Sequence, residues 1–238
     1  MSNTNETLIQ IGEVSRRDAL RSIALAVTVV AGGQMKLEAA QQVHSHAREE
    51  KKKTGSYKAK LFTEHEFKTL GRLAELIVPA DTVSGSARDA GAPEFIDLLA
   101  SQNEDLAAIF TGGLAWLDAE MRHRHSAPFV DAKPEQQTAM LDLLVKAQET
   151  DRERSAKGQT YEASEHYKDF KSYGIYAASD LGPGVVFFDW ARKMTVDAFY
   201  TSEIGIKDVD FRGNGSVSKY EVPKEVIDYA LKHSPFAS

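Results

Sequence analysis

Apolar residues recur at helical spacing over much of the chain, and the clearest example follows residue 63. Thr63 and Glu66 form a capping box, in which a hydroxyl at the N-cap and a carboxylate three residues later satisfy backbone N–H groups. Pro79 ends the pattern, because proline cannot continue a helix. The apolar positions between these signals are Phe67, Leu70, Ala74 and Ile77. This spacing predicts a helix with one buried face.

Similar patterns predict further helices from residue 93, over residues 104–124, from residue 134, over residues 185–200 and over residues 223–231. No stretch alternates apolar and polar residues over a useful length. The fold class that follows is all-α, an irregular helical domain. Gly112 and Gly113 interrupt the apolar stripe of residues 104–124, and they allow either close approach of a neighbouring helix or a kink.

The first 40 residues have the layout of a twin-arginine signal region. Arg16 and Arg17 follow a polar leader and precede the uncharged run Ile23–Ala31. That run is shorter than the roughly 20 apolar residues of a spanning helix. An amphipathic or frayed N-terminal helix with an accidental Arg-Arg pair is the alternative. Cleavage near Ala40 and retention as an uncleaved anchor both fit the sequence.

Residues 41–60 have the composition of a charged tether. They include the run Arg48–Lys53 and carry no broad apolar face that a helix could bury. The basic end of this segment could instead touch anionic lipid. We therefore expect the folded domain to span residues 61–238.

Composition and charge exclude several classes of protein. A hydrophobic share of 42% with 27% charged residues is ordinary for a globular domain. The formal net charge of -6 disfavours nucleic acid as a partner. The chain has no cysteine, so it cannot form disulfides, thiolate-held iron–sulfur clusters or the thioether links of c-type haem.

Candidate chemistry within the chain is sparse. His123 and His125 lie two residues apart, so on a helix they point in different directions and do not share a metal. No Gly-x-Gly-x-x-Gly or Gly-x-Ser-x-Gly arrangement occurs. We therefore predict no catalytic, cofactor-binding or metal-binding residue in this chain. Thr201–Glu203 is interpreted as a helix end with Gly205 as its stop, although a partner could still use these polar groups.

Three blocks of sequence resemble one family. They are Thr63–Leu70 with the following Leu76–Asp81, then Ala90–Asp97, and finally Phe199–Lys207. Over most of residues 62–220 the chain is similar to the gluconate 2-dehydrogenase subunit 3 family. It departs from the family at Phe211–Ser218, where a proline- and glycine-rich run is usual, so the resemblance implies nothing about the contacts of the tail.

The resemblance implies a function by association. The chain would be the small, cofactor-free accessory subunit of a periplasmic, inner-membrane-associated dehydrogenase of gluconate or another sugar. Its partner would be a catalytic flavoprotein of the glucose–methanol–choline type that holds FAD, often with a cytochrome c subunit that holds haem c. Arg16 and Arg17 would engage the twin-arginine translocase, so that the small subunit carries the partner across the membrane.

The partner interface is expected on an aromatic patch from residues 161–176 or 187–200. Its candidate residues are Tyr173, Tyr176, Phe188, Trp190, Tyr200, Thr201, Ser202 and Glu203. Two alternatives remain. One is a stand-alone periplasmic enzyme in which carboxylates such as Asp81 and Glu203 meet in a helical cleft, and the other is a ligand-binding or scaffold module.

Overall fold

A computed structural model describes residues 37–156, 180–211, 222 and 224–233. Within these ranges every regular element is a helix, which confirms the all-α class. In chain order the elements are α2 (Leu37–Thr54), α3 (Glu64–Ile77), α4 (Ala92–Ala100), α5 (Glu104–His125), the 3₁₀ turn η1 (Phe129–Asp131), α6 (Pro134–Ala156), α8 (Gly182–Tyr200), α9 (Glu203–Asp208) and α10 (Lys224–His233). Within the same ranges, none of these helices has the length and apolar composition needed to cross a bilayer.

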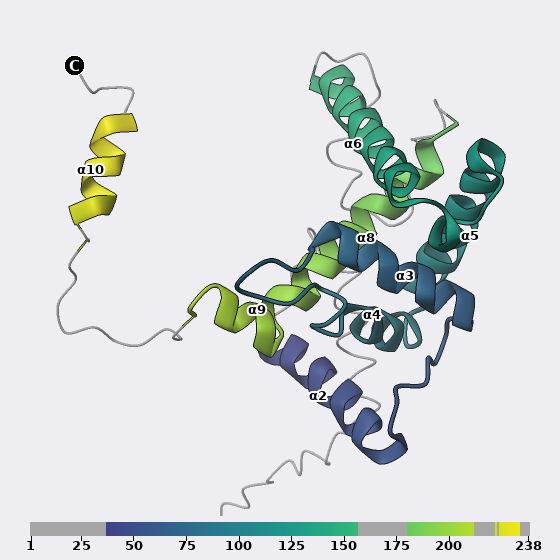
Figure 1. The fold of residues 1–238 in the computed structure, drawn as a ribbon, viewed down its shortest axis with the longest axis horizontal. Helices are drawn as coiled ribbons and strands as arrows, with labels where there is room; N and C mark the ends of the chain where they lie inside the picture. Colours follow the sequence, from purple (N-terminus) through teal and green to yellow (C-terminus); the bar gives the residue numbers. More distant parts are fainter. Residues whose placement is uncertain (1–36, 157–179, 212–221, 223, 234–238) are drawn as a thin grey trace, which may run out of the picture.

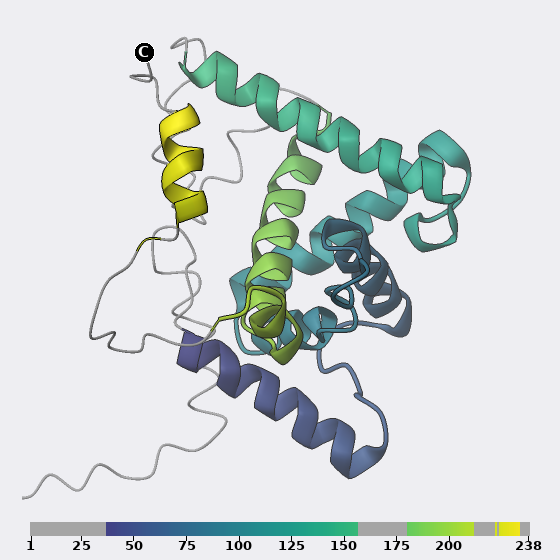
Figure 2. The ribbon, with the colours of Figure 1, turned by 60° about the vertical axis from the view of Figure 1, so that its left-hand side comes forward.

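Helix α8 is the centre of the domain. It packs against α3, α4, α5 and α6, and α9 follows at its end (Figure 1). Its buried side includes Phe187 and Phe199, which are each 1% exposed. Figure 2 shows α6 lying across one end of α8 and α2 lying below the other end. Helices α3, α4, α5 and α6 therefore surround one central apolar helix.

Glycine permits the closest approach between α5 and α8. A Cβ atom added to Gly113 would lie 2.1 Å from the ring of Phe187. In the other direction, a Cβ atom added to Gly184 would lie 2.0 Å from the ring of Trp116. Each helix thus accommodates an aromatic ring of the other at a position without a side chain. Of the two interpretations of the Gly112–Gly113 pair, close approach is the one that the packing supports.

The start of α3 confirms the capping box. The Glu66 N–H donates to Thr63 Oγ1 at 3.3 Å, and the Thr63 N–H donates to Glu66 Oε2 at 2.8 Å. Helix α5 begins in a related way, because Asn103 Oδ1 accepts hydrogen bonds from the N–H groups of Asp105 and Leu106. Local side-chain chemistry therefore sets where both helices begin.

Helix α2 differs from the solvated tether expected over residues 41–60. One narrow side of it is buried against α4, and that side consists of Ala40, Val43, His44 and Ala47. Its other sides are rich in charge, which explains why the composition suggested a tether. Small side chains are sufficient here because they let α2 lie close to α4. Part of the segment expected to precede the domain thus packs on it.

The connection from α2 to α3 is fixed by a buried carboxylate on α4. Asp97 is fully buried and accepts hydrogen bonds from Tyr57 Oη at 2.7 Å and from the backbone N–H groups of residues 60–62 at 2.7 to 3.1 Å. Burial, together with the neighbouring Asp97 carboxylate, raises the pKa of Tyr57 well above its usual range. This cluster of donors compensates the cost of burying the carboxylate.

The end of α8 corrects the interpretation of Gly205 as a helix stop. Thr201 is the C-cap of α8, and Ser202 is already the N-cap of α9, with its hydroxyl accepting from the Gly205 N–H at 3.1 Å. A Cβ atom on Gly205 would lie 2.1 Å from the carbonyl oxygen of Phe199. Glycine is needed here for the tight packing of α9 against the end of α8.

Candidate functional site

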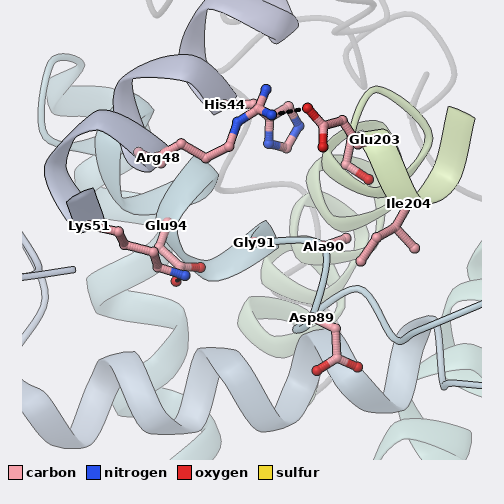
Figure 3. A pocket seen from close by; sticks show the side chains of 11 residues that line it. His44, Arg48, Lys51, Asp89, Ala90, Gly91, Glu94, Glu203 and Ile204 are labelled. Atoms are coloured by element: carbon pink, nitrogen blue, oxygen red, sulfur yellow. Dashed lines mark hydrogen bonds and ion pairs between the residues drawn. The ribbon is translucent and has the colours of Figure 1, made fainter. Parts of the chain in front are cut away.

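A cavity of about 170 Å³ lies where α2, the start of α4 and α9 meet (Figure 3). Helix α2 lines one side of it with three polar side chains. Helix α9 lines a second side, and the turn before α4 lines a third. Its lining consists of His44, Ala47, Arg48, Lys51, Asp89, Ala90, Gly91, Glu94, Ser202, Glu203 and Ile204. These residues come from distant parts of the sequence, so the cavity exists only in the folded domain.

His44 is the most deeply buried basic side chain of this lining, at 6% exposed. Its Nε2 lies 3.2 Å from Thr201 Oγ1, and its ring centroid lies 4.9 Å from that of Phe95. Burial lowers the pKa of His44 to about 4, against a hydrogen bond to the Ala198 backbone that acts in the opposite direction. The imidazole is therefore neutral at pH 7, and it packs as a polar core residue between α2 and α8.

Two ion pairs near His44 connect α2 to α9 and to α4. The Arg48 guanidinium pairs with the Glu203 carboxylate, and Lys51 Nζ lies 2.5 Å from Glu94 Oε1. The hydrogen bond from Arg48 lowers the pKa of Glu203, with the charge of Arg48 acting in the same direction. Since the Arg48–Glu203 pair is largely exposed, water and salt screen it, and its contribution to stability is small.

The other polar groups of the lining serve the backbone. Ser202 Oγ donates to the Phe199 carbonyl at 2.6 Å while it caps α9. Asp89 accepts from the Ser86 hydroxyl at 2.7 Å and from the Ser86 N–H at 2.9 Å, and these bonds lower the pKa of Asp89. Neither side chain pairs with a general base in the way that a nucleophile requires. The residues around the cavity therefore attach α2 to the domain, and we call it the joint cavity.

A second hollow of about 390 Å³ shares Lys51, Asp89 and Glu94 with this cavity and continues toward α3. It adds two cations, Lys68 and Arg88. Each cation lies near a carboxylate: Lys68 Nζ is 2.7 Å from Glu64 Oε1, and an Arg88 nitrogen is 3.9 Å from Glu75 Oε2. The positive charge is thus balanced locally, and this weighs against a dedicated anion site.

The joint cavity lacks the size of a cofactor site, and the second hollow is lined largely by charged side chains that already have partners. The joint cavity is smaller than the roughly 300–1,000 Å³ of typical small-molecule pockets. Over the part of the chain that the structure describes, no three His, Cys, Asp or Glu side chains group closely enough to hold a metal ion. The residues present do not fit a flavin, and we assign none to them.

The candidate interface residues differ in how far they are exposed to solvent. Arg16, Arg17, Tyr173 and Tyr176 lie outside the described residues. Phe188 and Ser202 are buried, whereas Trp190 and Thr201 are partly exposed. Tyr200 is 43% exposed, and the Glu203 side chain is more exposed still. On this surface Tyr200 and Glu203 are the side chains most available to a partner, and the interface itself stays a prediction.

Asp81 does not line the cavity that Glu203 lines. Its Oδ1 accepts from the N–H groups of Val83 and Ser84 at 2.7 and 2.8 Å, and these bonds lower its pKa. The carboxylate therefore stabilises its own turn.

His44 and Arg48 are the site residues that sequence analysis missed. The repeat of Ala40, Val43 and Ala47 at helical spacing was the signal that could have revealed them.

Comparison with protein families gives one match. The model of the family described as gluconate 2-dehydrogenase subunit 3 matches residues 64–217, well over half of the chain. Comparisons with curated proteins and with solved structures return no match. The matched range contains α3 to α9, including the two carboxylate-bearing walls of the joint cavity, and leaves α2 and α10 outside. The chain belongs to the gluconate 2-dehydrogenase subunit 3 family.

Proposed function

We propose that this chain is the accessory subunit of a periplasmic, membrane-associated FAD-dependent dehydrogenase of gluconate or a related sugar. It carries the twin-arginine signal for a flavoprotein of the glucose–methanol–choline type and stabilises that catalytic subunit. A cytochrome c subunit with haem c would complete the electron path. The observation that carries this proposal is the family match over residues 64–217.

The geometry of the joint cavity supports a non-catalytic role. Its ionic side chains are engaged with one another or with backbone groups, as in the pairs Arg48–Glu203 and Lys51–Glu94. A catalytic group would need to be free to exchange protons or electrons with a substrate. We therefore assign the chemistry to the partner and the recognition to this chain.

The position of α2 supports the role in export. Helix α2 begins at Leu37, directly after the leader sequence, and its buried stripe fastens it to α4. A signal that directly precedes a fixed helix is attached to the folded domain, and the twin-arginine route transports folded proteins. Any subunit bound to this domain would then be exported with it.

The experiment replaces both arginines of the signal, as Arg16→Lys with Arg17→Lys, in cells that co-express the catalytic subunit. We expect the flavoprotein and its activity to remain in the cytoplasmic fraction, because the partner has no other route. The matched control is Arg21→Lys, which makes the same exchange in the leader outside the pair and should leave export unchanged. If the flavoprotein still reaches the periplasm in the double variant, the carrier role is overturned.

A further inference from the structure

Exposed apolar side chains concentrate at the C-terminal end of the described chain. Within the described ranges, every large hydrophobic side chain that is exposed, apart from Val83, lies between Tyr200 and Leu231. They are Tyr200, Val209, Phe211, Val222, Val226, Ile227, Tyr229 and Leu231. An uneven distribution of this kind marks an interaction surface, whereas scattered single residues do not.

Helix α10 carries four of these side chains. At 100° per residue, its aliphatic side chains fall on one side of the helix and include Val226, Ile227 and Leu231, which are 54%, 44% and 63% exposed. Its charged residues Glu225 and Lys232 fall on the opposite side. Figures 1 and 2 both show α10 standing apart from the other helices. The helix is thus amphipathic, and its apolar side faces solvent.

A helix of this length needs a surface to bind. Isolated helices shorter than about 12–15 residues are marginal in water, and amphipathic helices gain most of their stability from packing of the apolar side. Helix α10 has ten residues and obtains no such packing from the other residues that the structure describes. Its sequence pattern is therefore that of a segment which is stable only when it is bound.

Charge and area identify the kind of surface. Lys224 and Lys232 are balanced by Glu225 and Asp228, whereas a helix that binds anionic membranes is rich in Lys and Arg on its polar side. A ten-residue helix is about 15 Å long and about 10 Å wide. Two copies that met only along α10 would therefore bury far less than the roughly 800 Å² per partner of a stable interface. An apolar groove on a larger protein can enclose the helix on several sides.

We propose that α10 docks by its apolar side into a hydrophobic groove on the catalytic flavoprotein subunit, with Tyr200, Val209 and Phe211 contacting the edge of that groove. This inference rests on the proposed function, which supplies the partner. Helix α10 lies beyond the residues that match the family model. It would therefore be an attachment specific to this chain and its own catalytic subunit, added to the contacts of the common domain.

The test uses the full chain co-expressed with the catalytic subunit and purified through a tag on that subunit. The variant Ile227→Gln with Leu231→Gln removes apolar groups from the docking side and keeps a good helix former at both positions. The matched control, Glu225→Gln with Asp228→Gln, introduces the same residues on the polar side. We expect the dissociation constant of the complex to rise about tenfold or more in the first variant and to stay unchanged in the control.

The results of co-purification, affinity and stability measurements distinguish failure of the proposed function from failure of the proposed role of α10. If the wild-type chain does not co-purify with the flavoprotein, the proposed function fails. If wild type and the apolar-side variant bind equally tightly, the proposed role of α10 is overturned while the proposed function stands. The thermal midpoint of the isolated chain should be equal in both, because the α10 side chains that are replaced are exposed and bury nothing against the described helices. A lower midpoint in the variant, dimerisation of the wild-type chain alone, or α10-dependent binding to anionic vesicles would each overturn docking on the flavoprotein.

Discussion

The ring of Phe187 occupies the space that a side chain at residue 113 would need, since a Cβ atom on Gly113 would come within 2.1 Å of it. Phe187 is 1% exposed and lies in the contact between α5 and α8, so it has no room to move aside. We expect Gly113→Ala to lower the free energy of unfolding by about 2–3 kcal/mol, as overpacking of a well-packed core does. Urea unfolding of the isolated chain measures this.

The adjacent glycine is the control. Nothing lies within 4 Å of a Cβ atom at Gly112, which is exposed on the same helix. Gly112→Ala should therefore raise the free energy of unfolding by about 0.5–1 kcal/mol, because alanine loses less backbone entropy in a helix. Equal stability of Gly113→Ala and wild type would mean that α5 and α8 can separate at no cost, contrary to the packing found here.

Docking of α2 depends on its narrow buried stripe more than on its charges. Val43 is fully buried against the domain, whereas Ser45 is exposed two residues later. We expect Val43→Asp to release α2, because an unpaired carboxylate cannot be buried there. Trypsin should then cleave within Lys51–Lys53 about tenfold faster than in wild type, since cleavage follows the population of the open state.

Ser45→Asp introduces the same carboxylate on the exposed side and should leave the cleavage rate unchanged. Arg48→Gln removes the exposed pair with Glu203 and should change the rate by much less than Val43→Asp. Equal cleavage of wild type and Val43→Asp would show that residues 41–60 behave as the solvated tether that their composition suggests.

Sequence patterns predicted the helices well where the determining information is local. The capping box of Thr63 and Glu66 lies within four residues, and both of its hydrogen bonds are present. Proline and asparagine likewise mark the starts of α4 and α5. At α3 and α5 a neighbouring side chain satisfies backbone N–H groups that the helix leaves unpaired, and at α4 proline removes one such N–H. No tertiary contact is needed to place these boundaries.

Tertiary contacts decided the features that sequence patterns missed. The partner of Gly113 is a ring on another helix, and no local pattern could identify it. Helix α2 is charged over most of its surface, and its burial depends on α4 supplying a surface close enough for alanine and valine. Gly205 resembles a helix stop, but it is glycine because α9 packs against the Phe199 carbonyl. The joint cavity likewise depends on long-range contacts, because α2, the start of α4 and α9 form it together.

The burial of His44 predicts a loss of stability in mild acid. Its pKa is about 4 in the folded chain and 6.5 in the unfolded chain. Above pH 6.5 the imidazole is neutral in both states and contributes nothing. As the pH falls from 6.5 to 4, only the unfolded chain binds the proton, so the free energy of unfolding falls by up to about 3 kcal/mol. His44→Gln, which keeps a hydrogen-bonding side chain, should remove this loss.

Urea unfolding at pH 7.5, 5.5 and 4.5 measures the effect as the difference between wild type and His44→Gln. Thr201→Val is the matched control, because it removes the partner of the His44 ring and leaves the titrating group in place. The control should retain the acid-dependent loss. If His44→Gln and wild type lose stability in parallel between pH 7.5 and 4.5, the imidazole is not held neutral by burial.

Asp197 on α8 changes stability with pH in the opposite direction to His44. In the wild-type chain the two effects on the free energy of unfolding partly cancel. Burial raises the pKa of Asp197 to about 6 from 3.8, and Lys193 only partly opposes this. Its contribution to stability is therefore complete below pH 3.8 and is lost as the pH rises through 6. As the pH rises from 4 to 6, Asp197 lowers the free energy of unfolding while His44 raises it. The plot of stability against pH should therefore be flatter for wild type than for His44→Gln or Asp197→Asn.

Asp197→Asn should therefore raise the free energy of unfolding by about 2 kcal/mol at pH 7.5 and leave it nearly unchanged at pH 3.5, because the wild-type carboxyl is already protonated there. The matched control lies on the same helix. Asp189 is buried but accepts from Gln148 Nε2 at 2.9 Å and lies 2.7 Å from Lys193 Nζ, so its charge is compensated. Asp189→Asn should lower stability at pH 7.5, since it removes the carboxylate that pairs with Lys193 and Arg192 and that accepts from Gln148. If both substitutions change stability in the same direction at pH 7.5, burial is not what sets the protonation of Asp197.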